Sequence, residues 1–536
     1  MIDWIKKNKF HCLAIAIVTL LFVFSVFIRS DELKHELSAE KEWITAHSLI
    51  TFEIWDENGG PAAYNFAPIY TYPGEGNKDI AALGGVRDEA LNLYYVSYPP
   101  GTFVFGYYLT KILGGPDLDS IRTLGLLIHY ICALLIYLIV RKLSSSTHDR
   151  IQWAGLIAVA FYLFSAGHLW IHGFLYFSDI LVQPLVLGLF LLLIQPIRTK
   201  ALSKKRLMAI VGLVFLGCWT EWLMLFFAFV TGLYFLWIYI RQKEKMFLIA
   251  FFAVGFTAAF ALLITILHYS TIGGFDQFVE VSLNKYQERS GAVGQTIGSA
   301  DFNITNPKSY ELLMGHFKNH YWMLINCATI ILIGFVLAAL AQLKWKILSF
   351  KSTHWTVFVL FSLALLMHLV VFFNFNALHD FAKLKLGTWL ILFIAGVLVV
   401  IESSSNKWLR WVFLGATSLL IIIRLPIEID RFHTQSEESW FAHFYKEAAV
   451  EMREHSGPDD LVFLNIPYLQ PEFIYRSKHN SYKVPDVSQA AHILKSQSVK
   501  SGHFYEFDKV KLMMAYEIKV VNDNLVIGDT LFVTGN

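Results

Sequence analysis

The stretch HLWIHGFLYFSD places two histidines and an aspartate within 12 residues. His168 and His172 are four positions apart, and Asp179 follows where a long apolar run begins. Imidazole and carboxylate groups so arranged can bind a divalent ion, or can position a phosphate and an acceptor group. Asp179 is therefore a candidate catalytic residue, both histidines are candidate substrate ligands, and Asp179 with His172 could hold a metal. The simpler alternatives are a helix cap for Asp179 and local hydrogen bonds for the histidines.

A second group of ionisable residues lies in NFNALHDFAKLKLG, between two apolar runs. His379 and Asp380 are candidate substrate ligands there. Lys383 and Lys385 fall in an outer turn, whereas lysine in short loops usually lies on the inner side of the membrane. They therefore favour an anionic partner such as a lipid phosphate. Arg289, in another connection, is a further candidate for that phosphate. Snorkelling to head groups and surface ion pairing are the alternatives.

Composition indicates that a membrane positions these groups. The chain has 536 residues, of which 55% are hydrophobic and only 16% charged. Apolar runs of about 20 residues, the length that spans a bilayer, recur along it, and one longer run divides in two at GCWTE. We predict an all-α polytopic membrane protein with about 11 transmembrane helices, at 10–28, 121–140, 152–171, 179–196, two within 207–240, 246–268, 321–343, 355–374, 386–403 and 408–424.

Charge then orients the chain. Lys6, Lys7 and Lys9 precede the first apolar run, and every second connection after it is basic, which places the N-terminus inside. Residues 29–120 and 269–320 are then long outer loops of a membrane domain at 1–424. Residues 425–536 read as a small outer α/β domain, because an amphipathic pattern is followed by a Gly-Pro turn and an alternating strand.

The first outer loop carries its own amphipathic pattern. Trp43, Ala46, Leu49 and Ile50 recur at helical spacing, and acidic residues mark the other faces. The aromatic piece from Tyr98 to Leu113 is too short to span a bilayer, and its proline pair favours a helix start. We predict two helices that lie in the membrane surface.

These features together resemble the GT-C class of membrane glycosyltransferases, the group that includes protein O-mannosyltransferases and the lipid A aminoarabinose transferase. The resemblance covers most of residues 1–400. It depends on SYPPGTFVFGYYLTKILGG, where the family has a proline pair before an aromatic helix, on YFSD, and on HDFAKLK. Their order and topological side carry more weight than any one of them.

The resemblance implies inverting transfer of a sugar from a polyprenyl-phosphate donor to a hydroxyl acceptor on the outer face. Such transfer needs a base for the acceptor proton and cations for the departing lipid phosphate. Glu42 is the first choice as base, on the first interfacial helix where the family keeps its acid. His47, Asp56 and Tyr98 are further substrate candidates, although a solvated acidic face is an equal explanation for any single acid.

Glu221 departs from the family pattern, since several members have lysine at the comparable bend. Either the alignment slips there, or Glu221 contacts a hydroxyl or amino group of the substrate; a carboxylate at the wet end of a broken helix is the alternative. In the family, an outer loop at the place of 269–320 often orders over substrate, so we expect it to be mobile without substrate. A divalent cation, Mg²⁺ or Mn²⁺, could assist, and no cofactor is required by the sequence.

The expected partners are a polyprenyl-phosphate sugar, a glycan, lipid or protein acceptor, and membrane lipids, with no nucleic acid. The expected location is a bacterial inner membrane, with the C-terminal domain outside. An O-antigen ligase or polymerase is the main alternative, although HDFAKLK offers few cations for it. A transporter would place charges deep in several spans, and a non-enzymatic scaffold would not need clustered acids.

Overall fold

The computed structural model describes residues 9–37, 41–78, 85–144, 152–291, 303–345, 352–403, 406–437, 440–465, 471–496, 501–506, 513–521 and 524–534. The chain divides into two compact units. The helical unit consists of Met1–Lys34, Arg122–Thr265 and Leu283–Gln435. The mixed unit consists of His35–Ile121, Ile266–Ser282 and Ser436–Asn536.

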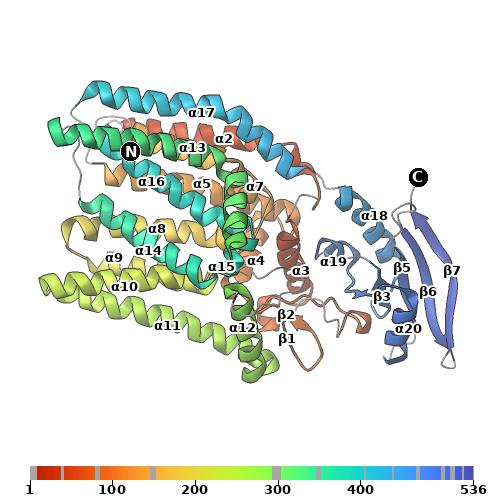
Figure 1. Ribbon diagram of the computed structural model, residues 1–536. Coiled ribbons are helices and arrows are strands. Elements are labelled where there is room, and N and C mark those ends of the chain that lie inside the picture. Colours follow the sequence, from red (N-terminus) through yellow and green to blue (C-terminus); the bar gives the residue numbers. More distant parts are fainter. Residues whose placement is uncertain are drawn as a thin grey trace. The chain divides into compact units, whose positions relative to one another are not determined.

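The helical unit is built from long apolar helices that run side by side (Figure 1). They are α2 (Lys9–Arg29), most of α5 (Leu118–Leu143), α6 (Trp153–Phe164), α7 (Ala166–Phe174), α8 (Ser178–Thr199), α9 (Lys204–Thr220), α10 (Leu223–Gln242), most of α11 (Lys245–Gly273), α13 (Pro307–Trp345), α14 (Ser352–Val371), α15 (Phe373–Leu378), α16 (Leu384–Glu402) and α17 (Lys407–Ser436). Helix α8 packs against α9 and α14, and α16 packs against α6 and α13.

The chain is a polytopic, mainly helical membrane protein, as its composition predicts. Seven of the described helices are long and apolar enough to cross a bilayer, or eight if α6 and α7 form one bent span. The predicted division at GCWTE is confirmed, because α9 ends at Thr220 and α10 begins at Leu223. The predicted total of eleven spans stays a prediction.

The span predicted at 152–171 is interrupted, because the chain bends by 59° between α6 and α7. Ser165 has an extended backbone (φ −70°, ψ 134°). The main-chain N–H of Ala166, which would otherwise lack an acceptor, donates to Glu428 Oε2 at 2.9 Å. Glu428 Oε1 also accepts from the N–H of Met323 at 3.3 Å, just after the irregular Tyr321 inside α13. One buried carboxylate therefore supports two helix interruptions.

The mixed unit combines helices with two sheets. Its elements are α3 (Trp43–Glu57), β1 (Val86–Arg87), β2 (Leu93–Tyr94), α4 (Gly101–Leu113), α18 (Trp440–His455), β3 (Leu461–Leu464), α19 (Pro471–Ser477), β4 (Tyr482–Lys483), α20 (Val487–Ser496), β5 (Ser501–Glu506), β6 (Met513–Val521) and β7 (Asn524–Thr534). The larger sheet has the order β4-β3-β5-β6-β7, parallel among β4, β3 and β5 and antiparallel from β5 to β7. Helix α20 packs on β5 and β6 (Figure 1).

Both helices predicted for the first loop are present as α3 and α4, and the second begins directly after Pro100. The predicted helix, Gly-Pro turn and strand of the C-terminal region are also present, as α18, Gly457-Pro458 and β3. The predicted loop 269–320 differs, because it includes α12 (Phe275–Ser290) and the start of α13. Residues 292–302 of that loop lie outside the described residues, and its mobility stays a prediction.

Candidate functional site

Asp179 lies in the first turn of α8 and is nearly fully buried, with 3% of its surface exposed. The N-cap of α8 is Phe177, with no side-chain capping bond. Lys385, near the start of α16, instead donates from Nζ to Asp179 Oδ1 at 3.2 Å. Removing two charges from water is costly unless they are paired. Asp179 therefore balances a buried ammonium group rather than capping its helix.

A charged cluster surrounds this pair. Phe375 in α15 receives two cations on its ring, since Lys385 Nζ lies 5.5 Å and the Arg289 guanidinium 5.4 Å from the ring centroid. Glu221, buried between α9 and α10, interacts electrostatically with both cations and with Asp179. We call Asp179, Glu221, Arg289 and Lys385 the charged cluster. Two of the three cations predicted to bind a lipid phosphate thus come together.

Glu221 also has a local structural role. Its Oε2 accepts the main-chain N–H of Leu223, in the first turn of α10. A carboxylate at this position satisfies a free N–H and interacts favourably with the helix dipole. Glu221 therefore stabilises the start of α10, and the same side chain also contributes charge to the cluster.

The charged cluster borders a cavity. This cavity has a volume of about 20 Å³. Its polar lining comes from Asp179, Lys385, Gln183 and Thr388, and the rest of its wall is apolar. Phe361 of α14 lines this cavity and also a second, larger one. The charged end and the apolar space are therefore neighbours within the helical unit.

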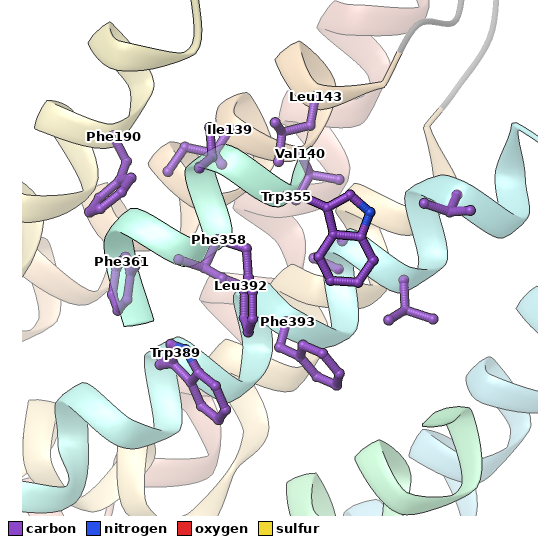
Figure 2. A pocket seen from close by; sticks show the side chains of 15 residues that line it. Ile139, Val140, Leu143, Phe190, Trp355, Phe358, Phe361, Trp389, Leu392 and Phe393 are labelled. Atoms are coloured by element: carbon purple, nitrogen blue, oxygen red, sulfur yellow. The ribbon is translucent and has the colours of Figure 1, made fainter. Parts of the chain in front are cut away.

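The second cavity is almost entirely apolar and has a volume of about 60 Å³. Figure 2 shows aromatic rings of α14 and α16 facing one another across it, with Ile139 and Val140 of α5 and Phe190 of α8 alongside. The rings of Phe358 and Trp389 lie 5.5 Å apart. Such a lining accepts hydrocarbon and offers few partners for polar groups.

His168 and His172 belong to a buried network on α7. The Tyr162 hydroxyl lies 2.9 Å from His172 Nε2 and donates to Gln183 Oε1. Gln183 Nε2 in turn donates to Thr388 Oγ1 at 2.6 Å, and His168 Nε2 lies 3.4 Å from the same oxygen. The histidines are thus connected to the polar cavity through Gln183 and Thr388, two residues that line it.

The other predicted residues near α15 have local partners. Lys383 is fully buried and donates to the carbonyl oxygens of Asn376, Ala377 and His379, at the end of α15. Asp380 Oδ1 accepts from the N–H of Phe381 at 2.8 Å, and the His379 ring stacks on that of Phe381 at 4.9 Å. These contacts give Lys383 and Asp380 a helix-end role that the sequence analysis did not consider.

The described residues offer few ligands for a metal ion. In the described parts of the chain, no three His, Cys, Asp or Glu side chains gather in a way that could hold one. Asp179, a predicted ligand, is paired with Lys385, and His172 with Tyr162. We therefore derive no step through a metal ion.

The predicted residues of the first loop lie in the mixed unit. Glu42 stands at the N-terminus of α3 and is fully buried. Glu472 of α19, a residue that the sequence analysis missed, has a pKa raised to about 8, mainly by burial and further by the neighbouring Glu42. His47 packs against the Tyr70 ring at 4.4 Å, and burial lowers its pKa to about 3, so it is neutral near pH 7. Two acids therefore share the start of α3.

Asp56 and Tyr98 make contacts that hold the loop together. Asp56 forms an ion pair with Lys111 and accepts from the Tyr107 hydroxyl at 2.9 Å, and these bonds lower its pKa. They join α3 to α4. The Tyr98 carbonyl accepts from the Tyr269 hydroxyl at 2.6 Å, and the Tyr95 and Tyr98 rings lie 6.1 Å apart. Tyr98 thus sits beside an aromatic group that includes Tyr95.

No protein-family model matches this sequence, and no curated protein sequence matches it either. Solved structures do match. The archaeal oligosaccharyltransferase AglB from Archaeoglobus fulgidus, in complex with an inhibitory peptide and a dolichol-phosphate, aligns with 94% of this chain and 70% of its own, at a TM-score of 0.57 and 13% identity. ArnT from Cupriavidus metallidurans, bound to undecaprenyl phosphate, aligns with 93% of each chain, at a TM-score of 0.51 and 10% identity.

The chain has the GT-C fold. The resemblance predicted from the sequence motifs is confirmed at that level. In this fold the motif YFSD contributes Asp179 to the charged cluster, and HDFAKLK contributes Lys385. The two motifs are 206 residues apart in the sequence, and α8 and α16 bring them together.

The sequence analysis missed several polar residues of the buried network beside the polar cavity. Tyr162, Gln183 and Thr388 were not singled out, although a glutamine and a threonine inside apolar runs are a usable signal. His129, whose ring stacks on His172 at 4.5 Å, was also missed. Polar side chains within spans usually face the bundle interior, and these could have been found on that ground.

Proposed function

We propose that this chain is an inverting glycosyltransferase that moves a sugar from a polyprenyl-phosphate donor to a hydroxyl acceptor. The observation that carries the proposal is the position of the charged cluster beside apolar space. Lys385 and Arg289 supply positive charge at one end, and the aromatic cavity of Figure 2 supplies a hydrocarbon environment close by. A polyprenyl phosphate has the same two parts, an anionic head and an apolar chain.

The reaction assigns a role to each group. A carboxylate accepts the proton of the acceptor hydroxyl while the hydroxyl oxygen bonds to the anomeric carbon of the donor sugar. The bond from that carbon to the phosphate oxygen breaks, and the electron pair leaves with the polyprenyl phosphate. Lys385 and Arg289 stabilise this growing charge, and Asp179 holds Lys385 in place. Glu42 remains the proposed base.

We further propose that the reaction occurs on the outer face of a bacterial inner membrane, with the N-terminus cytoplasmic. The alternation of basic connections along the sequence supports that orientation. The acceptor would be a component of the cell envelope, a glycan, a lipid or a protein. AglB was solved with an inhibitory peptide and a dolichol-phosphate, and ArnT with undecaprenyl phosphate, so the neighbours favour no single acceptor class.

Sugar transfer in reconstituted vesicles tests this function. The parent protein, Glu42→Gln and Asp179→Asn are each supplied with a polyprenyl-phosphate sugar and an envelope extract, and sugar release from the donor is followed. We expect turnover by the parent and a loss of roughly 100-fold or more in both variants, the usual size for a removed general base or charge partner. Full activity in both variants would contradict the roles proposed for Glu42 and Asp179. Consumption of a different glycan lipid, with no use of the polyprenyl-phosphate sugar, would favour a ligase or polymerase.

A further inference from the structure

The mixed unit contains a polar cavity that the proposed transfer chemistry does not use. It has a volume of about 300 Å³, at the lower end of the range of about 300 to 1,000 Å³ typical of small-molecule sites. Its lining comes from α3, from the loop at Tyr72 and Pro73, and from the ends of α18 and α19. Segments far apart in the sequence therefore build one concave surface.

A fixed ion pair forms one wall of this cavity. Lys478 pairs with Glu53, and the Tyr72 hydroxyl donates to Glu53 Oε2 at 2.9 Å. Lys478 Nζ also lies 4.2 Å from the ring centroid of Tyr475 and 5.3 Å from that of Tyr72. A lysine held by one carboxylate and two rings is preorganised, so it can present its remaining hydrogens to a ligand at little entropic cost.

Lys478 occupies an unusual backbone position. Its φ is 62°, in the left-handed region, directly after α19. Glycine or asparagine is favoured at such a helix end, because other side chains are strained there. The strain is tolerated at a residue whose side chain forms the cavity wall, as is common at binding sites.

The lining of the cavity includes further polar groups. Glu57 and Arg453 are exposed side chains that line the cavity. His479 is buried, and its Nε2 lies 3.1 Å from the Ser456 carbonyl, to which it must donate. Burial lowers the pKa of His479, so the ring is neutral and Nδ1 is an acceptor. Among the described residues, Nδ1 has no hydrogen-bond partner.

The charges of the cavity select a class of ligand. The charges of the two carboxylates and the two cations cancel. A phosphate would compete with Glu53 for Lys478. An ammonium group would be repelled by Lys478 and Arg453. A neutral molecule with many hydroxyl groups avoids both conflicts, because each hydroxyl can donate to a carboxylate or His479 and accept from a cation. Carbohydrates have this property.

We propose that the cavity bounded by Glu53, Tyr72, Arg453 and Lys478 binds a neutral carbohydrate segment of the acceptor. The proposal rests on the glycosyltransferase function proposed above, since it makes the acceptor a glycan or glycolipid. The cavity holds sugars that do not react, and so it selects which acceptor is used.

Binding of oligosaccharides to the full-length protein in detergent tests the proposal. The probes are neutral oligosaccharides of defined structure on an array, with a peptide array in parallel. We expect the parent to bind at least one oligosaccharide. Arg453→Ala and Tyr72→Phe should weaken that binding by roughly 5-fold or more, the loss of one or two hydrogen bonds. Glu454→Gln is the matched control, because Glu454 is exposed on the same helix but does not line the cavity.

Three results would overturn the carbohydrate site: no oligosaccharide bound by the parent, binding unchanged in Arg453→Ala, or binding of peptides alone. Polyprenyl-phosphate binding, measured on the same proteins, separates this failure from failure of the proposed function. Arg453→Ala should bind the lipid normally, and Lys385→Met should lose the lipid but keep the oligosaccharide. A parent that binds oligosaccharide but no polyprenyl phosphate would leave the cavity in place and remove the proposed donor.

Discussion

Lys383 and Lys385 are two positions apart in the sequence, but their ammonium groups have different partners. Lys383 donates to main-chain carbonyl groups at the end of α15, whereas Lys385 pairs with Asp179 in the charged cluster. The sequence predicted one lipid-phosphate site for both, because both are lysines in the same short connection. Only the turn formed by α15 and the first residues of α16 separates their functions.

Lys383→Met should therefore lower stability without changing donor binding. The variant leaves carbonyl groups at the end of α15 without a donor, which costs about 1 to 3 kcal/mol for a buried acceptor. Thermal unfolding in detergent and the affinity for undecaprenyl phosphate measure the two effects. A clear loss of affinity with unchanged thermal stability would assign Lys383 to the lipid phosphate after all.

Glu472 provides a pH-dependent test in the mixed unit. Its pKa is raised from 4.5 to about 8 by burial beside Glu42, so the folded protein keeps a proton that the unfolded chain loses. This proton favours the folded state fully below pH 4.5, and that advantage is lost as the pH rises toward 8. Glu472→Gln mimics the protonated acid. We expect its Tm to exceed that of the parent by a few degrees at pH 9, by roughly 2 °C or more.

The same comparison at pH 4 supplies the control, because Glu472 is then protonated in both the folded and the unfolded parent and the two proteins should unfold alike. Glu42→Gln should act in the same direction as Glu472→Gln, since it removes the second acid of the pair. An equal Tm difference at both pH values would contradict the raised pKa of Glu472.

At the scale of elements, helix interruptions determine where polar groups can enter the bundle. The division at GCWTE could be predicted, because the basic connections required a turn there. The break at Ser165 could not, because the acceptor for the N–H of Ala166 is Glu428 of α17, 262 residues away in the sequence. Local propensity predicts a helix here, but a carboxylate far away in the sequence stabilises the interruption of that helix.

Glu428→Ala should destabilise the helical unit. It leaves the N–H groups of Ala166 and Met323 without an acceptor, at a cost of about 1 to 3 kcal/mol each. Glu428→Gln keeps one amide oxygen and should restore part of the loss. Thermal unfolding of the three proteins gives the order parent, Gln, Ala. If the Ala variant is as stable as the parent, the carboxylate does not support the two breaks.

At the scale of the whole molecule, the GT-C fold could be predicted from the order of motifs along the chain, although each motif is short. The pairing of Asp179 with Lys385 could not, since no local pattern links positions 206 residues apart. The apolar cavity of Figure 2 was also beyond the sequence, because its aromatic residues resemble ordinary lipid-facing ones. Helix packing decides which of them line a cavity.

Gly396→Leu tests whether that cavity accepts the polyprenyl chain. Gly396 lines the cavity, and a Cβ atom there would meet no atom within 4 Å, so a leucine side chain can begin there without a clash at its first carbon. We expect weaker binding of a long polyprenyl phosphate, by roughly 10-fold for a lost apolar contact of about 1 to 2 kcal/mol. A short-chain phosphate should bind as before.

Gly255→Leu in α11 is the matched control, because it also has open space around it but does not line the cavity. Equal weakening of long and short phosphates by Gly396→Leu would indicate a general structural effect. Unchanged binding of both would place the chain elsewhere.

The central claim is that Lys385 holds the phosphate of a polyprenyl lipid, and equilibrium binding of undecaprenyl phosphate to purified protein tests it most directly. The account predicts saturable binding by the parent, a loss of roughly 10-fold or more in Lys385→Met, as for a removed charge-assisted hydrogen bond, and unchanged binding in Lys34→Met, whose lysine is exposed. Undiminished binding in Lys385→Met would contradict it.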